Sequence, residues 1–205
     1  MFLNLCFGSQ KGWKTYWVEI KDSFLEISTE YQKPPFIAFH LGTLKVRPTK
    51  NFPEKPDVLE FYDEEGFSKA SFFVFTYDPF DILQFFNDVS NTFKSWRERV
   101  SSERRRLQFN GEIKQSGFLS RPYKWTVSET SVTIPKGGKD EVVPFTREEI
   151  GFFTPSIKSG KIGVFTYTSK NSQETEYKCT DLAQMKELLD AIYTNEYIAL
   201  FVEQQ

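Results

Sequence analysis

Hydrophobic and polar residues alternate along most of the first 77 positions, in short runs separated by turn-forming residues. The clearest case is KGWKTYWVEIKDSFLEI, residues 11–27, in which two alternating runs flank Lys21 and Asp22. Such alternation is typical of strands with one buried face, and a polar pair between two runs predicts a hairpin. Further strand-like runs cover residues 2–7, 36–46, 58–62 and 71–77.

The period of the pattern changes at Asp78. The apolar positions that follow at steps of three or four are Phe80, Leu83, Phe86, Val89 and Phe93. This spacing puts them on one face of a helix. Asp78 is suited to accept hydrogen bonds from the free amides of the first turn, and Pro79 fits the first helical position because it lacks an N–H. We therefore predict a helix that runs through Trp96 toward Arg104.

The second half of the chain repeats this scheme. Three matched stretches begin at Tyr16 and Tyr123, at Phe39 and Phe145, and at Asp78 and Asp181. Their order is the same in both halves, which predicts two copies of one unit made of several strands followed by a helix. We place the two domains at residues 1–104 and 105–205. Because no Gly-rich, Ser-rich or Pro-rich linker separates them, we expect a stiff join.

Composition narrows the class of protein. The 205 residues are 39% hydrophobic and 26% charged, which is typical of a soluble globular chain, and the 17% of aromatic residues favours β-rich cores. A net charge of −2 argues against coating by nucleic acid. Cys6 and Cys179 are too few for a disulfide framework, which favours a reduced, cytoplasmic protein. No apolar run reaches the ~18–20 residues that span a bilayer, so any membrane contact is expected to be peripheral.

The first hairpin and the helix after FVFTYDP resemble a pleckstrin homology (PH) domain. The stretch Trp13-Lys14-Thr15-Tyr16-Trp17-Val18-Glu19-Ile20-Lys21-Asp22 is similar to the family's second strand and the turn after it. Together with the repeat, the resemblance implies a mainly β protein. Its expected architecture is two PH-like seven-stranded β-barrels or sandwiches, each capped by a C-terminal α-helix.

Many PH domains bind inositol-lipid head groups through loops at the open end of the barrel. The resemblance implies phosphate contacts at Lys11, Lys14, Tyr16, Lys45 and Arg47 in the first unit, and at Lys114, Arg121 and Lys124 in the second. Tyr16 and Tyr123 occupy positions where lipid-binding relatives carry an arginine. A tyrosine hydroxyl donates one neutral hydrogen bond, whereas arginine forms a charged bidentate contact, so we expect weak lipid selectivity.

Several of these residues also have an ordinary structural interpretation. Lys11 and Lys14 are equally typical of solvated loop lysines. The run 104–106, three arginines at a predicted helix end, suits either the helix dipole or an anionic partner. Trp13 and Trp17 lie four positions apart on a predicted strand and therefore share a face. We expect at least one of them to pack in the core, with an aromatic rim beside the binding loops as the alternative.

The sequence offers no constellation for catalysis or metal binding. His40 is the only histidine and stands in a strand pattern, where we expect a structural or exposed role. No zinc-ligand spacing or phosphate-binding glycine loop is present, and no nucleophile, base and orienting group can be assigned. We therefore expect neither an enzyme nor a cofactor.

The expected function is that of a non-catalytic adaptor module for signalling, which docks weakly on acidic phospholipid or phosphoinositide surfaces. Its partners are then anionic lipid head groups at a cytoplasmic membrane surface. The alternative is a protein-protein interaction scaffold, in which a partner peptide adds to a strand edge. A variant of that alternative resembles the tandem PH-like modules of histone chaperones and places the protein in the nucleus.

Overall fold

The computed structural model of the chain describes residues 1–7, 12–42, 44–55, 57–63, 72–115, 122–136, 139–145, 152–155, 163–168 and 174–204. The chain forms two compact units, and they divide between Trp96 and Arg97, inside the first helix. The assignment of functional domains to residues 1–104 and 105–205 stays a prediction.

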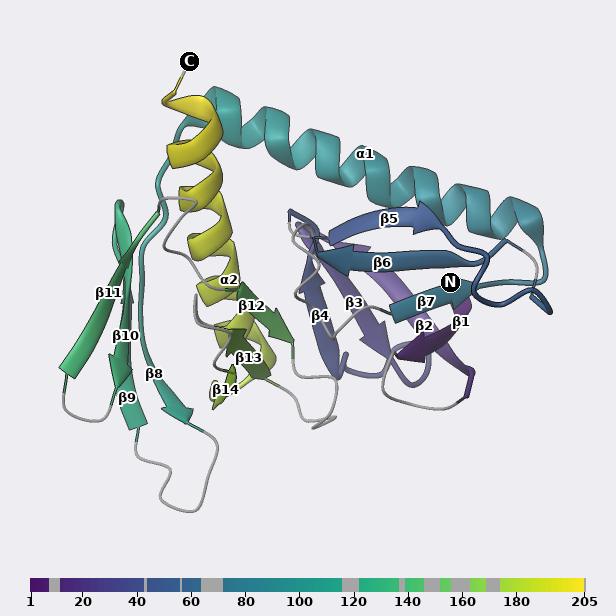
Figure 1. The fold of residues 1–205 in the computed structure, drawn as a ribbon, viewed down its shortest axis with the longest axis horizontal. Helices are drawn as coiled ribbons and strands as arrows, with labels where there is room; N and C mark the ends of the chain where they lie inside the picture. Colours follow the sequence, from purple (N-terminus) through teal and green to yellow (C-terminus); the bar gives the residue numbers. More distant parts are fainter. Residues whose placement is uncertain are drawn as a thin grey trace. The chain divides into compact units, whose positions relative to one another are not determined.

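Each unit consists of strands followed by a helix (Figure 1). The first contains β1 (Phe2–Phe7), β2 (Lys14–Lys21), β3 (Phe24–Ser28), β4 (Ile37–His40), β5 (Leu44–Pro48), β6 (Leu59–Asp63), β7 (Phe72–Phe75) and most of α1 (Pro79–Glu103). The second contains β8 (Phe109–Gln115), β9 (Pro122–Val127), β10 (Ser131–Lys136), β11 (Lys139–Pro144), β12 (Phe152–Pro155), β13 (Val164–Thr168), β14 (Glu174–Lys178), α2 (Leu182–Tyr197) and the short π-helix η1 (Ile198–Val202).

The two sheets have the same topology. The strand order is β4-β3-β2-β1-β7-β6-β5 in the first and β11-β10-β9-β8-β14-β13-β12 in the second, and the pairings are antiparallel. The first sheet curls until it is nearly closed (Figure 1). The prediction of a mainly β protein with a helix after each set of strands is confirmed.

The predicted hairpin is present in the first sheet. Lys21 pairs with Phe24, and Asp22 has a φ of 56°, a conformation that short polar residues tolerate in tight turns. The run 36–46, by contrast, forms two strands, because the chain turns at Gly42. The Gly42 N–H donates to His40 Nδ1 at 3.0 Å, and a Cβ at Gly42 would lie 2.9 Å from the His40 and Trp96 rings.

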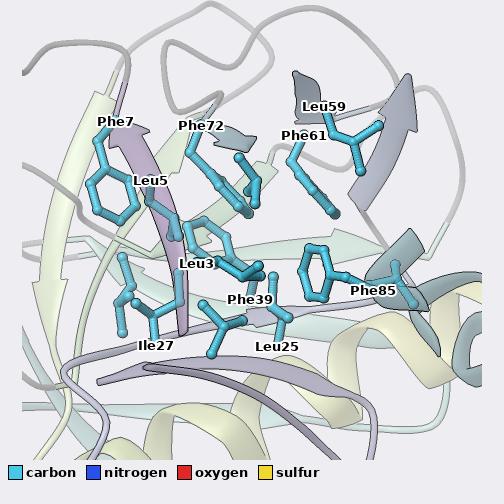
Figure 2. Close-up of a cluster of buried hydrophobic side chains, with 14 of the residues drawn as sticks. Leu3, Leu5, Phe7, Leu25, Ile27, Phe39, Leu59, Phe61, Phe72 and Phe85 are labelled. Atoms are coloured by element: carbon cyan, nitrogen blue, oxygen red, sulfur yellow. The ribbon is translucent and has the colours of Figure 1, made fainter. Parts of the chain in front are cut away.

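Large apolar side chains from every part of the first sheet fill its interior (Figure 2). Three phenylalanine rings stack in series, with centroids 4.7 Å apart between Phe39 and Phe72 and 4.8 Å apart between Phe72 and Phe61. Phe85 extends this core into α1, 5.7 Å from Phe61. Phenylalanine rings therefore form much of this core.

Helix α1 begins as predicted, since the Asp78 carboxylate accepts the Phe80 N–H at 2.8 Å. The prediction that Phe80 and Leu83 lie on the inner face of the helix is wrong, because they are 79% and 56% exposed. The residues that pack inward are Ile82, Phe85, Val89 and Trp96. Apolar residues stand on two stripes of this helix, both at steps of three or four. Contact with the sheet selects one of these stripes.

The second unit has an aromatic interior of its own. Trp125 is fully buried, with its ring 4.7 Å from Tyr177 and 5.7 Å from Phe165. Burial raises the pKa of Tyr177 to about 12 and also raises the pKa of Tyr167. Helix α2 packs against β8, β9 and β13, and the Asp181 carboxylate accepts the Gln184 N–H at 2.7 Å. Both helices thus start with an aspartate cap.

The connection between α1 and β8 contains Arg106 and Leu107, which we call the Arg106–Leu107 segment. Hydrogen bonds fix this segment to the rest of the second unit. Arg106 Nη1 donates to the carbonyl oxygens of Glu129 at 2.9 Å and Asn195 at 2.8 Å, and Nη2 pairs with the Glu203 carboxylate at 2.6 Å. Arg106 therefore has a structural role, whereas Arg104 and Arg105 are exposed.

Asn195, fully buried on α2, completes this clamp. Its side chain accepts the Leu107 N–H and donates to the Leu107 and Ser128 carbonyl oxygens, each at 2.8 Å. Both backbone groups of Leu107 are thereby satisfied, which fixes the segment against α2 and the end of β9.

Candidate functional site

Lys14 and Tyr16 lie on β2 of the first unit. Lys14 is exposed at the start of the strand. Tyr16 is half-buried, with its ring centroid 5.8 Å from Phe7 and 5.5 Å from Phe36, and burial raises its pKa. Tyr16 therefore contributes packing and a neutral hydroxyl rather than charge.

Lys45 and Arg47 are exposed on β5. Arg47 Nε donates to the Glu60 carboxylate at 2.8 Å, and its guanidinium carbon lies 4.5 Å from the centre of the Tyr62 ring. The hydrogen bond to Glu60 and its charge raise the Arg47 pKa. The positive charge that Arg47 would offer a phosphate is thus already compensated by a carboxylate.

In the first unit, Lys14 on β2 does not lie on a strand next to that of Lys45 and Arg47 on β5. Strands β1, β7 and β6 lie between β2 and β5 in the sheet order. Two further predicted residues, Lys11 of the first unit and Arg121 of the second, lie outside the described residues.

The second unit does bring basic residues together. Lys114 on β8 and Lys124 on β9 are exposed on adjacent strands, where Lys114 pairs with Pro122 and Glu112 pairs with Lys124. On the other side of β8, Lys114 lies directly opposite Lys178 of β14, which is also exposed. We call Lys114, Lys124 and Lys178 the lysine cluster.

The three lysines share the outer face of the sheet. Residues opposite each other on paired strands point to the same side, as do residues two apart on one strand. Lys114, Lys178, Pro122 and Lys124 therefore lie on one side, and buried residues such as Ile113 and Tyr177 alternate with them on the other.

The outer face also carries Glu112 and Glu176, each two positions from a lysine on its own strand, so the part of the cluster that favours an anion is the pair Lys114 and Lys178. Glu112 lies opposite Lys124 and offsets its charge, but Lys114 and Lys178 are like charges directly opposite each other, an arrangement that destabilises a sheet. A phosphate oxygen between the two ammonium groups would remove this repulsion and accept hydrogen bonds from both.

Sequence reasoning missed Lys178. The alternation in ETEYKC indicates that Glu176 and Lys178 face away from Tyr177 and Cys179, but it does not say which strand lies alongside. Pairing of β14 with β8 joins residues more than sixty positions apart, and no local pattern sets that register.

The outer face of the first sheet is aromatic. Trp13 and Trp17 share this face as predicted, but neither is in the core: Trp13 packs on Phe52 and Phe75, with centroids 5.0 and 4.7 Å apart, and Trp17 packs between Phe2 and Tyr31. The expectation of a core tryptophan at one of these positions is wrong, because Trp17 projects from the outer face of β2 and Trp13, which precedes β2, packs on the outward-facing Phe75.

The described residues contain no cluster of three or more side chains suited to hold a metal ion. His40 is buried between Phe24 and Trp96, with ring centroids 4.9 and 5.2 Å away. Cys6 and Cys179 are both buried free thiols, and burial raises the pKa of Cys179 to about 12.

No helix in the described part of the chain is both long and apolar enough to cross a membrane. In comparisons with known proteins, no family model matches the sequence, and no curated protein matches it significantly.

Proposed function

We propose that the chain is a non-catalytic adaptor built from two PH-like domains, which docks on acidic phospholipid surfaces through the lysine cluster of its second unit. In each unit a curled antiparallel sheet is followed by a helix, which is compatible with the PH fold. The observation that carries the proposal is the direct opposition of Lys114 and Lys178 next to Lys124.

The cluster suits a surface rather than a closed binding pocket. Its lysines are exposed on three adjacent strands of an open sheet face. Each lysine near an anionic membrane contributes about 1 kcal/mol, so the like-charge pair Lys114 and Lys178 gives about 2 kcal/mol, or roughly thirtyfold in binding. Lysine is a point charge without the geometry of an arginine fork, so docking responds to charge density more than to head-group shape.

Liposome co-sedimentation tests the proposal. Neutral vesicles are compared with vesicles that contain phosphatidylserine or a phosphoinositide, at low and high salt. The variant Lys114→Glu/Lys124→Glu/Lys178→Glu should lose binding to anionic vesicles roughly thirtyfold. The control Lys21→Glu/Lys33→Glu/Lys50→Glu changes the net charge equally at exposed lysines of the first unit and should bind almost as the wild type does.

A further arm tests the residues that the family resemblance indicates in the first unit. Lys11→Glu/Lys14→Glu/Lys45→Glu should weaken binding less than the cluster variant, because β2 and β5 are not adjacent in the sheet. Unchanged binding of the cluster variant would overturn the proposal, and so would an equal loss in the control.

A further inference from the structure

Helix α1 carries two apolar stripes, and only one of them meets the first sheet. Phe85 and Val89 are buried in the core of the sheet, whereas Phe80 and Leu83 are 79% and 56% exposed. Phe86 is half-buried beside the core. Figure 1 shows the strands of the first unit on one side of α1. We call Phe80, Leu83 and Phe86 the outer stripe.

The outer stripe is symmetric about Leu83. Successive residues of an α-helix are turned by about 100°, so Phe80 and Phe86, three positions before and after Leu83, lie about 60° to either side of it. The buried residue Phe85 is turned by about 160° from Leu83. Leu83 therefore stands at the middle of a face that points away from the sheet.

The part of the helix surface that holds the outer stripe is uncharged. The segment 79–93 contains two charged residues, Asp81 and Asp88, and both are turned by roughly 140–160° from Leu83 around the helix. The exposed neighbours Gln84 and Asn87 are neutral amides. Aromatic and aliphatic side chains without charge are typical of the buried centre of a protein interface.

These features suit a second copy of the chain as the occupant. In a two-fold interface each residue on the axis meets itself, so a charge at the centre would repel its own copy. When Leu83 lies on the axis and the two helices are antiparallel, Leu83 meets Leu83 of the second copy, and Phe80 meets Phe86 of the second copy on either side. Each side chain of the outer stripe then has an apolar partner.

We infer that the outer stripe is a dimerisation surface, on which α1 of one copy packs antiparallel to α1 of a second copy around Leu83. The contact covers one face of one helix, so we expect a weak dimer that forms with rising concentration. An acidic membrane is a poor occupant. The nearest charged residues along the chain are Asp78, Asp81 and Asp88, and the first lysine of α1, Lys94, follows about three turns after Leu83.

Dimerisation goes beyond lipid docking and does not depend on it. The lysine cluster belongs to the second unit, whereas the outer stripe belongs to the first. The dimer is measured without lipid, so failure of one proposal is distinguishable from failure of the other.

Analytical ultracentrifugation of the full chain measures the association. The mean mass should rise from 24.0 kDa at micromolar concentration towards twice that value as the concentration approaches millimolar. Leu83→Lys places like charges on the two-fold axis and should weaken the dimer at least about a hundredfold, because each copy loses an apolar contact and gains a repulsion. The control Ser95→Lys adds the same charge at an exposed position turned by about 120° from Leu83 and should dimerise as the wild type does.

Cysteine cross-linking tests the antiparallel arrangement. Leu83→Cys puts two thiols on the axis, where the Cα atoms of packed helices come close enough for a disulfide, and oxidation should give a covalent dimer. Asp88→Cys, on the opposite flank of the helix, should stay monomeric, and the two native thiols are buried. A mixture of Phe80→Cys and Phe86→Cys chains should cross-link faster than either variant alone, because antiparallel packing brings these two positions together.

Several outcomes would overturn the inference. They are a mass of 24.0 kDa at every concentration and equal weakening by Leu83→Lys and Ser95→Lys. Cross-linking of Asp88→Cys as fast as that of Leu83→Cys would show that the chains associate through another face. Preferential cross-linking of Phe80→Cys with itself would indicate parallel helices and would contradict the arrangement around Leu83.

Discussion

On the outer face of the first sheet, Asn4 lies between Thr15 of β2 and Phe75 of β7, whereas on the second sheet Lys114 lies between Pro122 of β9 and Lys178 of β14. The strand order and the sequence repeat make these positions equivalent. The first sheet covers Phe75 with Trp13 and leaves it 2% exposed, while the second leaves its lysines in solvent.

The next residue pairs on the same outer face, two positions along the strands, differ in the same way. Phe2 and Trp17 form an aromatic pair in the first sheet, where Glu112 and Lys124 form a charged pair in the second. The inner faces of both sheets remain apolar and aromatic. Two copies of one fold have thus kept the core that folding requires, and they have diverged on the outer face, where side chains are free to meet partners.

Phe75 of the first sheet and Lys178 of the second are equivalent residues, and exchanging them tests the difference in burial most severely. Phe75→Lys should destabilise the first unit by about 4 kcal/mol or more, because it removes a buried ring and places a charge beneath Trp13 and near the Lys55 ammonium, 4.9 Å from the ring centre. Urea unfolding measures the loss. The reverse change, Lys178→Phe, is the control and should alter stability by less than about 1 kcal/mol, since the site is exposed. Similar losses in both variants would refute the difference in burial.

The clamp on the Arg106–Leu107 segment provides the second test. Asn195→Ala should cost about 3 kcal/mol, because it leaves both backbone groups of Leu107 and the Ser128 carbonyl without this partner. The repeat pairs Asp78 with Asp181 and therefore Thr92 of α1 with Asn195, and Thr92→Ala should cost less than about 1 kcal/mol because Thr92 is only half-buried. Thermal unfolding of the two variants compares them, and an equally large effect at Thr92 would contradict the special role of the Asn195 clamp.

Alkaline pH should affect the second unit through its buried tyrosines. The folded pKa of Tyr177 is about 12, above its unfolded value of 10, so the fold favours the protonated phenol. Its stabilising contribution, about 2 kcal/mol, is complete below pH 10 and is lost as the pH rises from 10 to 12. Circular dichroism melts from pH 9 upward should show this loss. The variant Tyr177→Phe should show a smaller pH dependence in that range, and an unchanged slope would contradict the assignment.

The smallest change in stability is expected at the like-charge pair Lys114 and Lys178. Lys178→Glu converts repulsion with Lys114 into attraction across β8 and β14 and should stabilise the second unit by about 0.5 kcal/mol at low salt. The gain should vanish at high salt, because exposed charges are screened. Urea unfolding at two salt concentrations measures it. A salt-independent gain would point to packing rather than charge.

The sequence determined the elements of this protein because strands and helices follow from local periodicity. The hairpin at Lys21 and Asp22, the Asp78 cap and the repeated unit were all predicted from neighbouring residues, and the structure confirms them. The basic residues Lys114 and Lys124 were also recognisable, since the repeat places them beside a predicted hairpin.

Tertiary structure decided which faces of these elements meet. Phe80 and Phe85 both fit a helical stripe, and only packing on the sheet buries Phe85. Lys178 joins Lys114 through a pairing between distant strands, and Phe85 of α1 lies near Val18 of β2, more than sixty residues away in the sequence. Such contacts depend on the register and packing of the whole unit, which no local pattern specifies.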